Sequence, residues 1–266
     1  MTERFPELVA PASWRSVELI SDLHLHAGDP ATHAAWLAYL ARAPRPDALF
    51  ILGDLFEVWV GDDLLAPDEA HDDADRRFWR GCAQALSGFA RYTPTFFIAG
   101  NRDFLLGLEG LAACGMTALH DPTVLVFAGQ RWLLSHGDAL CLADTDYQSF
   151  RAQVRGADWQ RDFLARPLAE RQAIARDLRA RSEARKHRLG PDPGLWADVD
   201  ANTATAWLEQ AGAATLIHGH THRPAKHALA PGRQRLVLSD WDALAQPPRA
   251  EALRLSERGA QRVSAA

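Results

Sequence analysis

Aspartate, histidine and asparagine recur in five short motifs between positions 22 and 222 of this 266-residue chain. Their carboxylate, imidazole and amide groups are ligands that suit divalent manganese, iron or zinc. In chain order the motifs are Asp22-Leu23-His24, Gly53-Asp54, Gly100-Asn101-Arg102-Asp103, His136-Gly137-Asp138 and Gly219-His220-Thr221-His222. A Gly-Asp pair alone is more often a turn than a ligand. The five motifs together predict a metal-dependent hydrolase of phosphate esters or anhydrides.

A hydrolase with two metals needs cations about 3.5–4 Å apart and a group that bridges them. Asp54 is the best candidate for the bridge, because it stands alone in its motif and a carboxylate has two oxygens. Asp22 and His24 alternate along the end of a predicted strand, so we expect both side chains to point to one side and hold one metal. The other candidate ligands are Asn101, His136, His220 and His222. Two cations would also activate a bridging hydroxide, since metal binding lowers the pKa of water towards about 7.

Short apolar runs precede these motifs and predict buried strands that end at the site. The runs are Val17–Ile20, Ala48–Leu52, Thr95–Ala99, Val124–Phe127, Trp132–Leu134, Thr215–Ile217 and Leu236–Leu238. Helical patterns alternate with them; Trp36, Leu37 and Leu40 mark one apolar face. This order predicts an α/β domain with helices packed outside sheets. Gly129-Gln130 predicts a hairpin and therefore a mixed sheet.

The segment from Asp146 to Gly190 shows no strand pattern. Between Arg151 and Gly190 it carries eleven Lys/Arg against five Asp/Glu, a net charge of +6, whereas the remainder of the chain is −11. We interpret it as a helical lid, inserted over residues 146–195 in one domain of residues 15–266. Its charge favours contact with an anionic ligand or membrane over a merely solvated helix face. Arg171, Arg179 and Arg185 are expected to face such a surface.

Composition narrows the class of protein further. At 47% hydrophobic residues the chain can bury a full core, and no stretch has the roughly 18 apolar residues of a membrane span. The first residues lack the pattern of a signal peptide, and three cysteines without CxxC spacing argue against a disulfide framework or a structural zinc site. We therefore expect a cytoplasmic protein with reduced thiols.

The five motifs resemble the pattern of the calcineurin-like metallophosphoesterase superfamily, D-x-H, GD, GN-[HR]-[DE], H and GHxH. The resemblance implies a four-layer αββα sandwich of two mixed β-sheets with a dimetal site at the sheet edges. One metal would be held by Asp22, His24, Asp54 and His222. The other would be held by Asp54, Asn101, His136 and His220.

Longer stretches are similar to the UDP-2,3-diacylglucosamine pyrophosphatases of lipid A biosynthesis. They are Ser21–Leu25, Ile51–Glu57, Gly61–Asp63, Gly100–Leu105, His136–Asp138 with Leu140-Cys141, Tyr147–Arg151 and Ile217–Pro224. This resemblance implies hydrolysis of the diphosphate of UDP-2,3-diacylglucosamine at the phosphorus attached to uridine, giving UMP and 2,3-diacylglucosamine 1-phosphate. It further implies manganese as the metal and peripheral attachment to the cytoplasmic face of the inner membrane. We expect a monomer that binds no nucleic acid.

The same resemblance gives expectations for individual residues. Asp54, Asn101 and Arg102 are the expected catalytic residues. Protein phosphatases of the superfamily have histidine where this chain has Arg102, and a guanidinium can bind a diphosphate but cannot act as a proton donor. Substrate contacts are implied for Asn101, Arg102, Asp144, Ser182 and His220. Past Ser182 the chain departs from the family pattern, and Lys186 is the best substitute for its lysine.

Two other readings compete with this one. A soluble nucleotide pyrophosphatase or phosphodiesterase of the same superfamily would use the same ligands on a substrate without acyl chains. A non-catalytic scaffold would have kept the fold and lost activity. The scaffold is disfavoured because every ligand position of the pattern is filled.

Overall fold

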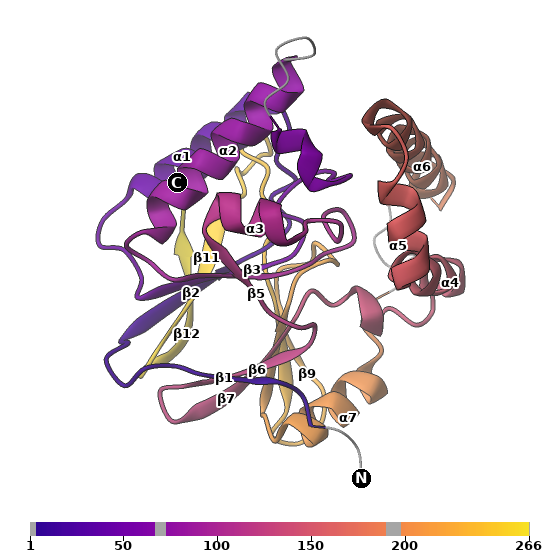
Figure 1. Cartoon of the computed structure of the whole chain (residues 1–266). Helices are drawn as coiled ribbons and strands as arrows, with labels where there is room; N and C mark the ends of the chain where they lie inside the picture. The colour runs from indigo at the N-terminus through magenta and orange to yellow at the C-terminus, as the bar shows by residue number, and fades with distance from the viewer. Residues whose placement is uncertain (1–3, 67–72, 190–197, 266) are drawn as a thin grey trace.

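The computed structural model describes residues 4–66, 73–189 and 198–265, without the side chains of residues 181–183 and 185–189. Two six-stranded sheets face each other (Figure 1). The first has the order β12 (Gly259–Ser264), β11 (Glu251–Ser256), β2 (Ser16–Ile20), β3 (Ala48–Leu52), β4 (Thr95–Ile98), β5 (Met116–Ala118). The second has the order β1 (Glu7–Val9), β6 (Thr123–Phe127), β7 (Gln130–Ser135), β8 (Thr215–His218), β10 (Gln234–Val237), β9 (Lys226–Ala228).

Alternate residues of each strand enter different cores, as the two-residue repeat of a strand requires. In β2, Val17 and Leu19 join the core between the sheets, whereas Ile20 joins the core beneath the helices. That outer core is covered by α1 (Pro30–Ala41), α2 (Ala74–Ala90) and α3 (Leu108–Cys114), and α7 (Ala201–Ala211) covers the other sheet. The layers are therefore helix, sheet, sheet, helix, and the predicted αββα sandwich is confirmed.

Each of the seven apolar runs coincides with a strand, although β4 and β10 end one residue before Ala99 and Leu238. Both sheets mix parallel and antiparallel pairs, as predicted. The hairpin between β6 and β7 turns at Ala128 and Gly129, one residue earlier than expected; both have positive φ, of 51° and 70°. The prediction for α1 was wrong at Leu37, which is 39% exposed, while Tyr39 is buried instead. Leu37 lies one position past Trp36 on the helix and so turns away from the core.

Three helices, α4 (Thr145–Val154), α5 (Ala157–Leu164) and α6 (Leu168–Leu189), stand to one side of the sandwich (Figure 1). They occupy the segment predicted as a lid; the end predicted for it, at residue 195, lies outside the described residues. Within the described ranges no helix is long and apolar enough to cross a membrane.

The expectation that Arg171 faces an anionic surface was wrong. Its side chain is buried: it pairs with Asp63 and donates to the carbonyl of Val60 at 2.5 Å. Arg179 is half-exposed but pairs with Glu57, and the side chain of Arg185 lies outside the described residues. The helical pattern predicted a basic helix, but it did not show that Asp63 and Glu57 on the body of the domain pair with its arginines.

Candidate metal centre

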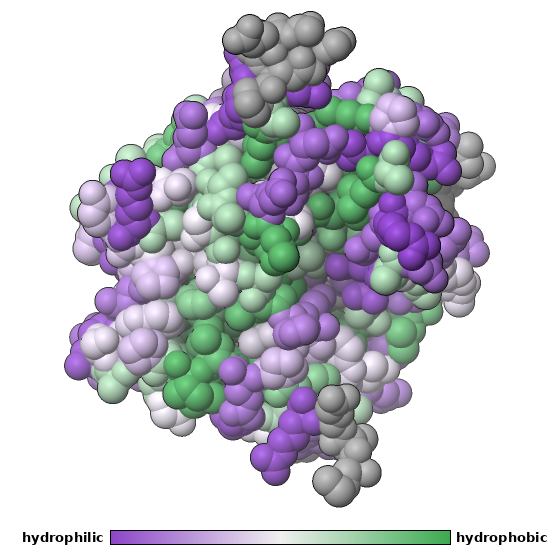
Figure 2. Space-filling view, viewed as in Figure 1, coloured by the Kyte–Doolittle hydropathy of each residue, from purple (hydrophilic) through white to green (hydrophobic). Residues whose placement is uncertain are grey.

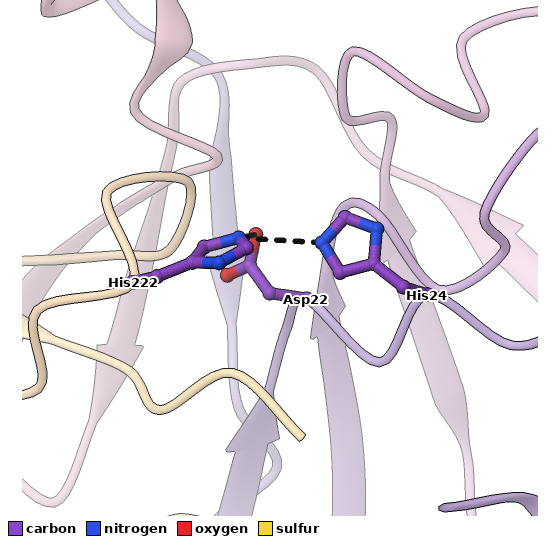
Figure 3. Close-up of side chains that lie close together, drawn as sticks. All are labelled: Asp22, His24 and His222. Carbon is purple, nitrogen blue, oxygen red and sulfur yellow. Dashed lines mark hydrogen bonds and ion pairs between the residues drawn. The ribbon is translucent and has the colours of Figure 1, made fainter. Parts of the chain in front are cut away.

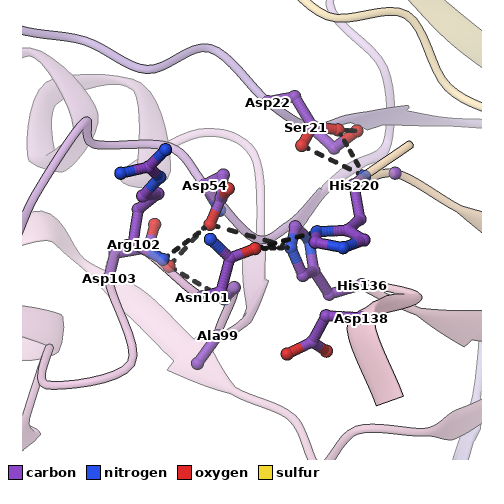
Figure 4. A network of polar contacts seen from close by, with 12 residues as sticks. Ser21, Asp22, Asp54, Ala99, Asn101, Arg102, Asp103, His136, Asp138 and His220 are labelled. Carbon is purple, nitrogen blue, oxygen red and sulfur yellow. Dashed lines mark hydrogen bonds and ion pairs between the residues drawn. The ribbon is translucent and has the colours of Figure 1, made fainter. Parts of the chain in front are cut away.

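The seven predicted ligands follow strands of both sheets and meet at one edge of the sandwich. Asp22 and His24 follow β2, Asp54 follows β3, and Asn101 follows β4. His136 follows β7, and His220 and His222 follow β8. Because these strands lie side by side in the centres of their sheets, residues up to 200 positions apart come together (Figures 3 and 4).

Two groups of ligand atoms form within this cluster. In the first, His222 Nε2 lies 3.3 Å from Asp22 Oδ1 and 3.2 Å from His24 Nε2 (Figure 3). In the second, Asn101 Oδ1 lies 3.0 Å from His136 Nε2 and 2.8 Å from His220 Nδ1 (Figure 4). Each group presents nitrogen and oxygen atoms toward a common point, the arrangement that a divalent cation needs.

Asp54 lies between the two groups. Its Oδ2 is 3.9 Å from His24 Nε2, and its Oδ1 is 3.7 Å from His136 Nε2. The backbone N–H of Arg102 donates to Oδ1 at 2.8 Å and fixes the rotation of the carboxylate. One oxygen therefore faces each group, the geometry that a bridging carboxylate requires.

The backbone conformation at the site differs from the prediction of an extended strand. Five of the seven predicted ligands have left-handed φ, namely Asp22 (55°), His24 (49°), Asp54 (52°), His220 (66°) and His222 (51°). A non-glycine residue in this region costs about 1–3 kcal/mol, and such residues cluster at functional sites. The left-handed residues turn the chain after β2, β3 and β8, so that Asp22 and His24 share a side for a different reason than strand alternation.

Glycines in the motifs allow the loops to approach closely. A Cβ at position 100 would overlap the carboxylate of Asp54, and one at position 219 would overlap the side chains of Asp22 and Ser21. The Gly-Asn and Gly-His pairs therefore place a ligand on a loop whose preceding residue must have no side chain.

Hydrogen bonds around the cluster fix the direction of its side chains. His136 Nδ1 contacts the carbonyl of Leu52 at 2.8 Å, which leaves Nε2 for a metal. The Asp22 carboxylate accepts from Ser21 Oγ at 2.6 Å and from the backbone N–H of His220 at 2.9 Å. Asp103, which the sequence reading gave no role, accepts backbone N–H groups of Gly100 and Leu55 at 2.8 Å and so joins two ligand loops.

The electrostatics of the cluster favour positive charge. Burial opposes protonation of His136, but the attraction of Asp54, Asp138 and Asp22 outweighs burial and raises its pKa to about 9. Burial and the neighbouring His136 lower the pKa of His220 to about 4. A second imidazolium is therefore not accommodated beside the first, whereas a cation held by neutral imidazoles and carboxylates would satisfy the whole group.

A family model for calcineurin-like phosphoesterases matches residues 17–224 of the chain. The chain belongs to this family. Three similar proteins carry the name UDP-2,3-diacylglucosamine hydrolase. The protein from Chromobacterium violaceum is 47% identical over 85% of this chain and 90% of its own length. The proteins from Xanthomonas axonopodis pv. citri and Chromohalobacter salexigens are 46% and 41% identical, over 84% of this chain in each case and 90% and 87% of their own lengths.

Membership in the phosphoesterase family implies a dimetal site, and the residues present fit one. Among the described residues, two sets of side chains lie close enough together to hold a metal ion: Asp22 with His24 and His222, and Asp22 with Asp54 and His136. All the residues in both sets are predicted ligands. The assignment of each side chain to a metal stays a prediction.

The residues predicted to contact the phosphoesterase's substrate do not all lie at the metal cluster. Arg102 follows Asn101, and its guanidinium Nη1 lies 3.7 Å from Glu57 Oε1. Asp144 caps the N-terminus of α4 by accepting from the backbone N–H of Tyr147 at 3.1 Å. Ser182 and Lys186 belong to α6, but their side chains lie outside the described residues.

Sequence reasoning missed Asp138, which belongs to the His136 motif and is buried. Its carboxylate accepts from the Tyr147 hydroxyl at 2.6 Å and from Arg151 Nε at 2.8 Å. The Tyr147 ring also stacks on His220, with centroids 5.9 Å apart. Arg155, which caps the C-terminus of α4, donates to the carbonyl of Gly100 at 2.8 Å. The only sequence signal for Asp138 was its position in the same motif as His136. That position did not indicate Tyr147 and Arg151 as its partners.

Proposed function

We propose that this chain hydrolyses the diphosphate of UDP-2,3-diacylglucosamine, releasing UMP and 2,3-diacylglucosamine 1-phosphate in lipid A biosynthesis. The observation that carries this conclusion is the common name of relatives that share 41–47% of their residues over at least 84% of this chain. The site supports it, because all seven ligand positions are filled and converge.

We propose that Asp22, His24, Asp54 and His222 hold one divalent ion and that Asp54, Asn101, His136 and His220 hold the other. When bound, the two ions supply Lewis acidity for the phosphate and an activated water as nucleophile. Asp54 would hold both ions, since one of its oxygens faces each group. Manganese is the proposed native metal.

Arg102 is proposed to neutralise the charge that develops on the leaving sugar phosphate. It lies next to Asn101, and its guanidinium is already oriented by Glu57. A guanidinium stays protonated and offers paired N–H donors to phosphate oxygens. His220, Asp144, Ser182 and Lys186 are proposed to make the remaining contacts with the substrate.

The residues at 146–195 are proposed to act as a lid that receives the acyl chains. Phe163 is buried, and Trp159 and Ile174 pack against the same hydrophobic core as Phe104. The Trp159 ring stacks on the Phe163 ring with centroids 4.7 Å apart, and its centroid lies 6.3 Å from that of Phe104. Hydrophobic surface is visible between the lid and the body of the domain (Figure 2). We propose that the acyl chains extend along this surface and away from the charged ligands.

We also propose that the protein acts as a monomer, attached peripherally to the cytoplasmic face of the inner membrane. Exposed Leu164 and Leu178 lie on the lid with basic residues of α6 nearby in the sequence. Apolar residues together with basic residues favour reversible binding to an anionic bilayer.

The test of this function is an assay of the purified chain with manganese on detergent-dispersed UDP-2,3-diacylglucosamine, with UMP as the readout. UDP-glucosamine without acyl chains is the matched substrate, and Asp54→Ala is the matched protein control. Release of UMP from the acylated substrate at a far higher kcat/KM is expected. Equal kcat/KM on both substrates would instead favour the soluble nucleotide pyrophosphatase.

The direction of attack can be tested with the same reaction in oxygen-18 water. We expect the label in UMP, because the phosphate attached to uridine is proposed to lie at the metal pair and the acylated sugar phosphate to leave toward the lid. Label in the sugar phosphate would invert the orientation of the substrate and remove the reason for placing the acyl chains at the lid.

A further inference from the structure

The carboxylate of Glu57 is surrounded by three nitrogen-bearing side chains from different parts of the chain. Oε2 lies 3.0 Å from Nδ1 of His24. Oε1 lies 3.2 Å from Nε of Arg179 on α6 and 3.7 Å from Nη1 of Arg102. The Glu57 side chain is only 9% exposed. One acidic group thus contacts a predicted metal ligand, the arginine next to another ligand, and the lid.

Backbone hydrogen bonds fix the segment that carries Glu57. Its own N–H donates to the carbonyl of Leu25 at 3.1 Å, beside the left-handed turn of His24. Two residues later, the N–H of Trp59 donates to the carbonyl of Arg102 at 2.9 Å. The segment is therefore fastened to both loops whose side chains Glu57 contacts, and the position of its carboxylate follows from the fold.

A carboxylate beside the second nitrogen of a metal-binding histidine sets the tautomer and the ring orientation of that histidine. Here the position of Glu57 beside Nδ1 leaves His24 Nε2 directed at His222 and Asp54.

We propose that Glu57 is a positioning residue: its carboxylate holds the imidazole of His24 for the metal and the guanidinium of Arg102 for the diphosphate, while Arg179 ties the lid to the same group. The part that concerns Arg102 rests on the proposed function. The part that concerns His24 requires only the metal site.

Asp63 offers a matched comparison. It also holds an arginine of α6, Arg171, to the same stretch of the body. Among the described residues, the hydrogen bonds and ion pairs of its carboxylate go to Arg171, and they involve neither a predicted metal ligand nor Arg102. A variant at Asp63 therefore disturbs the docking of the lid and leaves the surroundings of His24 unchanged, which separates lid anchoring from positioning of the metal ligand.

The experiment is calorimetric titration of manganese into metal-free Glu57→Ala, Glu57→Gln and Asp63→Asn proteins. Loss of a carboxylate partner of a metal-binding histidine typically weakens metal binding by 10–100-fold. We expect a loss of about that size in Glu57→Ala, a smaller one in Glu57→Gln, which keeps an oxygen near His24 Nδ1, and none in Asp63→Asn. The melting temperature of each metal-free variant shows whether it is folded.

Kinetics on the acylated substrate provide the second readout. Glu57→Gln at saturating manganese is expected to lower kcat, because Arg102 loses its orienting charge, whereas Asp63→Asn is expected to act on KM. Unchanged manganese affinity in folded Glu57→Ala, or an equal loss in Asp63→Asn, would overturn the positioning role. The titration uses no substrate, so a wrong substrate assignment would leave its result interpretable.

Discussion

The predicted metal ligands follow the ends of strands. In contrast, arginine side chains attach the lid, which consists of α4, α5 and α6, to the domain beside these ligands. Around the metal cluster, backbone N–H groups and carbonyls fix the side chains, as at Asp22, Asp54 and His136. In the lid, Arg151 binds Asp138, and Arg171 binds Asp63. Backbone groups cannot exchange partners without unfolding a strand end, but an arginine can release one anion and take another. We infer from this comparison that the metal cluster is rigid and that the attachment of the lid depends on charge.

The largest effect should follow from removing Asp54, the group that is proposed to bridge both metals. Asp54→Ala is expected to lower turnover by more than the roughly 10²–10³-fold that accompanies loss of one charge-stabilising group, since each cation loses a ligand. Metal analysis by mass spectrometry should find fewer than two ions per chain. Two retained ions with near-normal turnover would show that Asp54 is not the bridge.

Arg102→Ala removes a charge beside the metal cluster and keeps the backbone hydrogen bond that fixes Asp54. The bond that Arg102 makes to Asp54 comes from its backbone N–H, which alanine keeps. Metal content should therefore stay at the parental value while kcat falls by about 10²–10³-fold. Loss of metal from this variant would assign the Arg102 side chain to the structure of the site and not to the reaction.

Two aspartates that pair with lid arginines should differ strongly in their effect on stability. Asp138 is buried against Arg151, and Asp138→Asn is expected to cost about 2 kcal/mol, or roughly 4–8 °C in melting temperature. Asp158 pairs with Arg161 on α5, where both side chains are mostly exposed. Asp158→Asn should leave the melting temperature unchanged, as is usual for exposed pairs. Similar shifts in both variants would mean that Asp138 does not anchor α4.

Much of this comparison follows from the sequence, because buried strands and the polar residues after them leave a clear pattern. Each of the seven apolar runs coincides with a strand, and all seven candidate ligands meet. The edge strands β1, β5 and β9 were missed, since they are three residues long and largely exposed. Such strands are defined by their neighbours in the sheet and not by their own hydrophobicity.

Tertiary contacts account for what the sequence reading did not find. The left-handed backbone at His24 could not be predicted from the residue type, because positive φ is uncommon for every non-glycine residue, even though it is enriched for histidine. Arg171 was misplaced for a related reason: its partners, Asp63 and the carbonyl of Val60, lie more than 100 positions away. Glu57 was visible in a motif, but its role depends on Leu25 and Arg102 holding its segment from both sides.

The smallest expected effect concerns how the lid meets a membrane, and it tests whether the charge of the lid acts outside the protein as well as inside. Arg176 is exposed on α6, in contrast to the buried Arg171. A basic residue near an anionic bilayer contributes about 1 kcal/mol, so Arg176→Ala should weaken binding to vesicles with anionic lipid about fivefold at low salt. The effect should shrink as salt is added, because ions screen exposed charges.

The matched control is Arg15→Ala, which removes the same charge from the exposed residue that precedes β2, at the opposite end of that strand from Asp22. Vesicle sedimentation should show no change for this variant. Equal weakening by both substitutions would indicate that net charge alone draws the protein to the bilayer. In that case the basic residues of α6 would serve the substrate and the docking of the lid, and the comparison between a rigid site and a responsive cover would apply only within the protein.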